Sequence, residues 1–180
     1  MLGQIFYKNM YLYILNMSQT QEYLFPSKEW ADEWCKLLNG SKEYYEASKT
    51  APWDSVVLVS TNVPEKVRAT LIEMYKKGEA KADSVDFNST AGAIKLNIKE
   101  GRCLGTEFHT DMSKVVGSLI LEAPYDTWLK IIQGKLDVTV ALLGGSIKIK
   151  KGSLTELARY TNAAVIMSNM SRKIKSKILA

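Results

Sequence analysis

The residues best suited to chemistry in this 180-residue sequence gather around its only histidine, His109. Glu107 lies two residues before it and Asp111 two residues after it, a spacing that invites a metal site or a hydrolytic triad. All three fall at the end of one expected strand, without a second histidine or an obvious nucleophile. A solvated or locally hydrogen-bonded histidine is therefore the favoured interpretation.

Motifs that would bring a cofactor or a covalent mechanism are missing. The glycines of LLGGSIK, residues 142–148, match neither the P-loop nor the dinucleotide fingerprint, and they lead into a strand rather than out of one. No GxSxG nucleophile elbow occurs, and one histidine with two cysteines cannot complete a structural zinc site of the usual kinds. We predict no metal, no cofactor and no catalytic residues, and hence a protein that is not an enzyme.

Cysteine content and charge narrow the class of protein further. Cys35 and Cys103 are too few for a disulfide framework, and Cys103 is interpreted as a small buried hydrophobic residue. The net charge of +5 is mild and is not clustered as in a dedicated nucleic-acid binder. An anionic ligand or membrane surface would suit this charge equally well, and no nucleic-acid partner is predicted.

Apolar periodicity, caps and turn residues predict the elements that must position these side chains. Helices are expected over 28–39 after an N-cap at Ser27, over 63–77 with Asn62 and Glu65 as a capping pair, over 125–133, over 138–143 after Asp137, and from 154 onward after Ser153. Strands are expected over 54–61, 84–87, 92–99, 102–109, 116–123 and 146–150, with Glu100-Gly101 as a hairpin turn.

This order of elements predicts an α+β fold. It is a mainly antiparallel sheet of about five strands with helices packed on one face. Residues 18–180 are expected to form a single domain. Residues 1–17 are interpreted as an N-terminal extension upstream of the true start, with an interfacial membrane anchor as the alternative.

The segment YDTWLKIIQGKLDVTVALLGGSIKIKKGSLTELARY, residues 125–160, resembles the sterol carrier protein type-2 domain family. The matching features are the helix with Trp128, the Gly-Lys-Leu-Asp sequence that begins at Gly134, the short helix, the lysine-rich strand and Gly152 before the final helix. The match covers about Ser27 to Met170 and suggests a stand-alone prokaryotic, archaeal member in the cytoplasm. The resemblance implies an apolar tunnel for sterols, fatty acids or fatty acyl-CoA, and no catalytic residues.

Apolar residues occupy several faces of the final predicted helix, so one face can pack on the sheet while another lines a cavity. The predicted function is therefore non-catalytic binding or carriage of a lipid, fatty acid or fatty acyl-CoA. The alternatives are an accessory, substrate-presenting subunit of a lipid-metabolising enzyme and a scaffold without a ligand. The predicted tunnel residues are Trp128, Ile132, Leu136, Val140, Leu143, Leu154, Leu157 and Val165.

The C-terminal residues suggest a second, weaker interaction. Met170, Ile174 and Ile178 recur every four residues, which predicts one apolar helical stripe. The basic residues around it are Arg172, Lys173, Lys175 and Lys177. A solvated helix end is the favoured interpretation, and docking to an anionic membrane is the alternative. A partner enzyme or a homodimer is compatible with the sequence.

Overall fold

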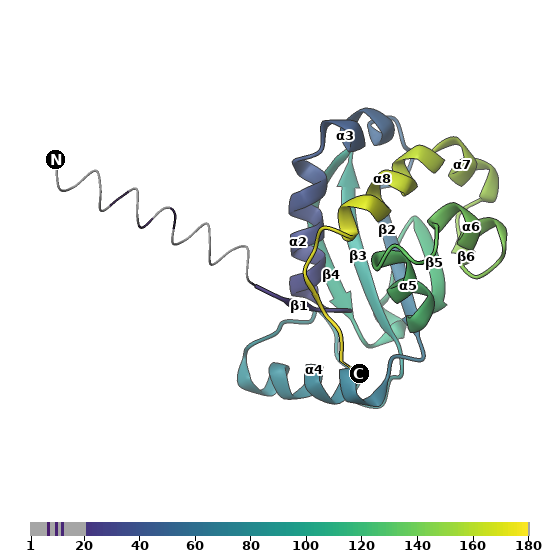
Figure 1. Ribbon diagram of the computed structural model, residues 1–180. Coiled ribbons are helices and arrows are strands. Elements are labelled where there is room, and N and C mark those ends of the chain that lie inside the picture. Colours follow the sequence, from purple (N-terminus) through teal and green to yellow (C-terminus); the bar gives the residue numbers. More distant parts are fainter. Residues whose placement is uncertain (1–6, 8–9, 11, 13–20, 180) are drawn as a thin grey trace.

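The computed structural model describes residues 7, 10, 12 and 21–179 (Figure 1). The expected extension over residues 1–17 lies outside these residues, apart from the three isolated positions. Five strands form the main sheet in the order β4-β3-β2-β5-β6: β2 (Ser55–Thr61), β3 (Gly92–Lys99), β4 (Arg102–His109), β5 (Leu119–Pro124) and β6 (Lys148–Lys151).

The sheet is mixed rather than purely antiparallel. β2 at its centre pairs antiparallel with β3 and parallel with β5, while the β3–β4 and β5–β6 pairs are antiparallel. The β3–β4 hairpin turns at Glu100 and Gly101, both with positive φ, as a primed turn requires. The predicted α+β class with about five mainly antiparallel strands is therefore confirmed, and the parallel pair is an addition that strand patterns alone did not indicate.

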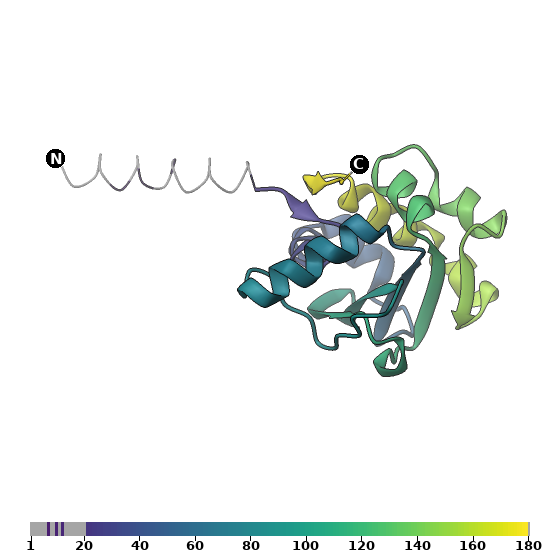
Figure 2. The same cartoon turned by 90° about the horizontal axis from the view of Figure 1, so that it is seen from below.

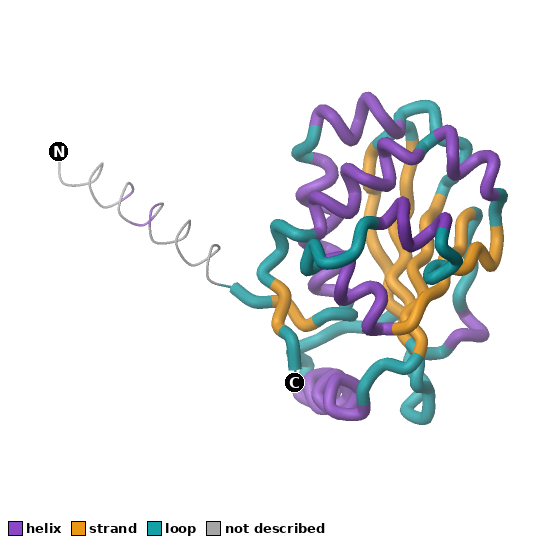
Figure 3. Tube along the Cα trace, turned by 45° about the vertical axis from the view of Figure 1, so that its right-hand side comes forward, coloured by secondary structure: helices purple, strands orange, loops and turns teal. Residues whose placement is uncertain are grey.

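Helices cover one face of this sheet (Figures 1 and 3). Within the described residues the helices are α2 (Lys28–Asn39), α3 (Lys42–Ser48), α4 (Glu65–Lys77), α5 (Tyr125–Ile132), α6 (Val138–Leu143), α7 (Leu154–Arg159) and α8 (Thr161–Ser171), of which α4 lies at one end of the sheet rather than over its face. Seen from below, α4 runs across the near end of the sheet (Figure 2). A short 3-10 helix, η1 (Met112–Lys114), precedes β5 on the chain. The main core joins β-strand residues such as Ile94, Leu96 and Leu119 to the buried faces of the helices.

Three predicted N-caps are confirmed, and one predicted capping pair is wrong. Ser27, Asp137 and Ser153 each accept hydrogen bonds from backbone N–H groups in the first turn of their helices. The Asn62–Glu65 capping pair does not form, because Asn62 adopts a φ of 52° and α4 begins only after Pro64.

The predicted strand over 84–87 is absent from the described residues, where only an isolated bridge joins Ser84 to His109. The final helix is not continuous, because the chain breaks it into α7 and α8 at Tyr160.

The C-terminal residues do not form the predicted helical stripe. α8 ends at Ser171, and β7 (Ser176–Lys177) pairs in parallel with β1 (Tyr23–Leu24). Ile174 is buried in the main core rather than presented on an apolar surface stripe. Tertiary pairing with β1 thus replaces the local helical preference, since an extended segment can hydrogen-bond to a free strand edge.

The cysteines also form a bond that the sequence did not predict. Cys35 on α2 and Cys103 on β4 form a disulfide, with a Cα–Cα distance of 5.5 Å, so Cys103 is not a free hydrophobic residue. Beside the disulfide, the Asn39 amide donates to the Cys103 carbonyl at 2.8 Å and accepts from its N–H at 2.9 Å. The last turn of α2 is therefore fixed to the edge strand by both a covalent bond and a two-point hydrogen bond.

We expect the double substitution C35A/C103A to lower the free energy of unfolding by about 4 kcal/mol. The reason is that the disulfide closes a loop between residues 68 apart, which restricts the unfolded chain. Chemical denaturation measures this change, and the native protein unfolded in the presence of a reductant should show a similar loss. A loss well below about 1 kcal/mol would contradict the prediction.

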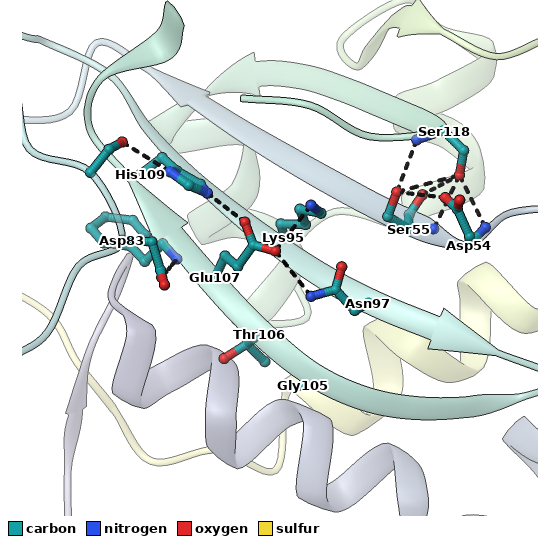
Figure 4. Close-up of polar contacts among 12 residues, drawn as sticks. Asp54, Ser55, Asp83, Lys95, Asn97, Gly105, Thr106, Glu107, His109 and Ser118 are labelled. Atoms are coloured by element: carbon teal, nitrogen blue, oxygen red, sulfur yellow. Dashed lines mark hydrogen bonds and ion pairs between the residues drawn. The ribbon is translucent and has the colours of Figure 1, made fainter. Parts of the chain in front are cut away.

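A row of polar side chains lies along β3 and β4 on the sheet face opposite the helices (Figure 4). Ser84 Oγ lies 2.9 Å from His109 Nδ1, and His109 Nε2 lies 2.9 Å from Glu107 Oε2. The other carboxylate oxygen of Glu107 accepts from Asn97 at 3.1 Å and lies 3.0 Å from Lys95 Nζ. His109 is thus buried and locally hydrogen-bonded. Sequence analysis favoured either a solvated or a locally hydrogen-bonded histidine, and the structure shows the second.

These contacts change the acidity of the central carboxylate. Burial alone would raise the pKa of Glu107, but the hydrogen bonds from Asn97, His109 and Lys95 lower it to about 2. Because the folded-state pKa lies below the ordinary value of 4.5, the charged carboxylate stabilises the fold above pH 4.5. This contribution is lost as the pH falls from 4.5 through about 2.

We expect E107Q to lower the melting temperature at pH 6 by about 3 °C, because it weakens this row by roughly 1 kcal/mol. The difference between the native protein and the variant should shrink as the pH falls from about 4.5 to about 2. Calorimetry across this pH range measures it. E43Q, which changes an exposed carboxylate on α3, is the control and should lower the melting temperature at pH 6 by less than E107Q does. A difference for E107Q that stays constant across the pH range would refute the prediction.

Candidate functional site

An apolar cavity lies between the helix-covered face of the sheet and the helices. Its volume is about 90 Å³. The lining residues come from helices on the covered face, from the strands beneath them and from the connecting segments: Phe25, Trp30, Trp34, Tyr44, Ser48, Ala51, Trp53, Val56, Leu58, Ile98, Leu119, Leu121, Trp128, Ile131, Ile132, Val138, Leu157, Tyr160, Ala163, Ala164, Met167, Ser168 and Ser171.

All four tryptophans of the chain line this cavity. Three of them satisfy their indole N–H with a fixed partner: Trp30 donates to Ser176 Oγ at 2.8 Å, Trp34 to the Met167 carbonyl at 3.0 Å and Trp128 to the Val59 carbonyl at 2.9 Å. With these N–H groups paired, the rings can contribute apolar surface to the wall.

The few polar groups of the wall come mainly from α3 and α8. Ser48 Oγ donates to the Tyr44 carbonyl and Ser171 Oγ donates to the Ser168 carbonyl, both at 2.6 Å. Burial raises the pKa of Tyr44, and a contact with Ser48 lowers it only in part, so the phenol is neutral at ordinary pH. None of the described lining residues carries a charge.

The predicted tunnel residues divide into two groups. Trp128, Ile132 and Leu157 line the cavity together. The others do not line it: Leu136 and Val165 are partly buried against the main core, while Val140, Leu143 and Leu154 are 60%, 74% and 52% exposed. Short α6 directs Val138 and Ala141 inward, which leaves Val140 and Leu143 outside. A lipid-binding role for any of the eight residues stays a prediction.

Sequence analysis predicted tunnel residues only between Trp128 and Val165, so it missed the part of the cavity wall that comes from the N-terminal third of the chain. The apolar stripe of α2, with Trp30 and Trp34, was interpreted as core packing. Paired tryptophans on one helical face were the available signal, but a stripe that packs solidly and one that borders a cavity have the same period. Tyr44 on α3 gave no comparable signal.

The other residues that sequence analysis singled out for chemistry lie outside the cavity wall. Among the described residues, no group of three or more His, Cys, Asp or Glu side chains could hold a metal ion. The row that includes Glu107 and His109 lies on the opposite face of the sheet from the cavity, and Asp111 instead caps η1 by accepting from the Ser113 N–H at 3.0 Å. Within the same described part of the chain, no helix combines the length and the apolar character needed to cross a membrane.

Comparison with known proteins gives structural neighbours only. No family model matches the sequence. No curated protein matches it either. The crystal structure of a sterol carrier protein 2 superposes with a TM-score of 0.64 at 24% sequence identity, covering 82% of this chain and 97% of that one.

A second neighbour is the solution structure of a conserved hypothetical protein from Thermus thermophilus, whose description suggests a sterol carrier protein. It superposes with a TM-score of 0.66 at 24% identity and covers 88% of this chain and 94% of that one. Both superpositions extend over nearly the whole length of the neighbour. The chain described here therefore has the fold of sterol carrier protein 2.

Proposed function

We propose that this protein binds the apolar chain of a lipid, a fatty acid or a fatty acyl group in the cavity and carries it without transforming it. The observation that carries the proposal is an uncharged, almost wholly apolar cavity at the centre of the fold, bordered by four tryptophans. Ligand sites are commonly concave and apolar with few polar groups, and this cavity fits that description. The fold it shares with sterol carrier protein 2 supports the same function.

The energetics favour an acyl chain over a small polar ligand. Each buried methylene contributes about 0.8 kcal/mol, so about 14 methylenes would gain roughly 11 kcal/mol before the costs of association. These costs are on the order of 4–15 kcal/mol. The cavity, at about 90 Å³, is smaller than the roughly 300–1,000 Å³ of typical ligand pockets. A longer chain must therefore widen the cavity or leave part of itself outside.

We expect a fatty acid brominated near the middle of its chain to quench the tryptophan fluorescence of the purified protein in a saturable manner. Bromine quenches by contact, and all four indoles border the cavity. The dissociation constant should be in the micromolar range or weaker. The unbrominated acid should compete with the quenching. Quenching that rises linearly with the concentration of the brominated acid and is not reversed by competitor would contradict the proposal.

A substitution that fills the cavity should weaken this binding. Ala164 on α8 lines the cavity and is only partly buried, so A164F can place its ring there. We expect at least a tenfold weaker dissociation constant, with a circular dichroism spectrum like that of the native protein. A69F, on the exposed surface of α4 and away from the cavity, adds the same ring and should leave binding unchanged. Equal binding by both variants would show that the ligand lies elsewhere.

A further inference from the structure

The most exposed of the large hydrophobic side chains that the structure describes lies at the end of α6. Leu143 is 74% exposed, and Val140, three residues before it on the same helix, is 60% exposed. Residues three apart are neighbours on a helix surface, so these two side chains form one outward-facing apolar surface. Val138 and Ala141 on the same helix are buried. α6 is therefore apolar toward solvent as well as toward the core.

This surface belongs to a stretch of chain without charge. Residues 138–147 contain no Asp, Glu, Lys or Arg, and the exposed residues Gly144, Gly145 and Ser146 follow α6 directly. We call residues 140–146 the α6 tip. Exposed α2 and α4 residues include several that are charged, as is usual for helices that face water. Two adjacent apolar side chains in an uncharged, exposed stretch indicate a contact site.

The α6 tip lies at one end of the molecule. α6, the edge strand β6 and α7 lie together there, on the right in Figures 1 and 2. The first residue of α7, Leu154, is also 52% exposed. A flat surface can therefore approach this end of the molecule without meeting α2, α3 or α4.

Exposed lysines flank the α6 tip on both sides along the chain. The acidic residue nearest to them in sequence, Asp137, is held as the N-cap of α6, where its carboxylate accepts from the N–H groups of Thr139 and Val140 at 2.8 and 3.1 Å. A second carboxylate, that of Glu122, lies 3.8 Å from one of the lysines, Lys150. The flanking lysines are Lys135 before α6 and Lys148, Lys150 and Lys151 on β6.

The positive charge of the whole chain is concentrated in the same part of the sequence. Residues 125–180 contain 10 basic and 3 acidic residues, whereas residues 1–124 contain 14 basic and 16 acidic ones. The part of the chain that includes α6 thus has a net charge of +7, and the remainder has a net charge of −2. A negatively charged surface is the electrostatic complement of this end of the molecule.

The small size of the apolar surface decides between a protein and a membrane. A stable protein interface, including one with a second copy of this chain, takes about 800 Å² and roughly 20–30 residues from each partner. The α6 tip offers two large exposed apolar side chains. A lipid bilayer needs no complementary shape, and shallow insertion of a few apolar groups together with basic residues is sufficient for reversible binding.

We propose that the α6 tip inserts into the headgroup region of an anionic lipid bilayer, with the flanking lysines beside the lipid phosphates. The inference goes beyond the proposed function and does not depend on it, because docking and cavity binding are measured separately. Val138, on the inner side of α6, lines the cavity. Docking would therefore bring one wall of the cavity close to the bilayer.

Co-sedimentation of the full chain with lipid vesicles tests the proposal. One set of vesicles contains equal parts of phosphatidylcholine and phosphatidylglycerol, and the other contains phosphatidylcholine alone. At low salt we expect the partition coefficient on the anionic vesicles to be at least about tenfold higher, because each basic residue near an anionic surface adds about fivefold. This preference should decrease as added salt shortens the Debye length.

Two pairs of matched variants locate the contact. L143Q should weaken binding to the anionic vesicles by about five- to twentyfold, because it removes an inserting apolar side chain. L104Q makes the same change at a leucine that is 67% exposed on β4, and it should leave binding unchanged. K148Q should weaken binding by about fivefold at low salt, whereas K76Q, at an exposed lysine on α4, should not.

None of the four substituted residues lines the cavity, so each variant should bind the brominated fatty acid as the native protein does. Equal retention of the native protein by the two kinds of vesicle, or equal losses for L143Q and L104Q, would overturn the inference. A change of oligomeric state that L143Q alone abolishes, without any vesicle binding, would assign the surface to a second copy and would also overturn it. If the brominated acid does not bind but L143Q still weakens vesicle binding, the proposed function fails and this inference stands.

Discussion

The packing of α2 against the sheet is the contact on which the rest of the structure depends. Trp30 and Trp34, 1% and 3% exposed, form its buried face, and their indole N–H groups reach two different C-terminal elements, β7 and α8. At the far end of α2, the disulfide and the Asn39 amide hold the helix to β4. One helix thus positions the edge of the sheet, the last long helix and the C-terminal strand. Three of the four indole rings are oriented by hydrogen bonds, and all four border a cavity of about 90 Å³ where a core would normally be closely packed.

Polar groups are paired differently on the two faces of the sheet. On the open face, Lys95, Asn97, Glu107 and His109 satisfy one another, and the row needs no ligand to be stable. On the covered face nearly all groups are apolar, and the unpaired Ser168 and Trp53 atoms stand out because nothing in the described chain completes them. The row around His109 is therefore paired within itself, whereas Ser168 Oγ and Trp53 Nε1 have no partner among the described residues.

The sequence by itself determined the elements and the fold class. Caps at Ser27, Asp137 and Ser153, the alternation around Ile94 and Leu96, and the turn at Gly101 are local signals, and local hydrogen bonding and side-chain periodicity decide them. These signals were sufficient for a mainly antiparallel sheet with helices on one face. They failed where a distant partner overrides local preference, as at residues 174–178, which a helical period describes although residues 176–177 pair with β1 as a strand.

Only the tertiary structure decided which apolar residues border a cavity and how the cysteines pair. The pairing depends on bringing residues 35 and 103 within 5.5 Å between their Cα atoms, and no local pattern encodes that distance. Likewise, the helical spacing of Trp34 and Leu157 is the same as that of residues in a closely packed core, although both line the cavity. The spacing of Leu143 is the same as that of a lining residue, although Leu143 is exposed. Periodicity reports which side of a helix is apolar, but the shape of the space that this side meets is set by several elements at once.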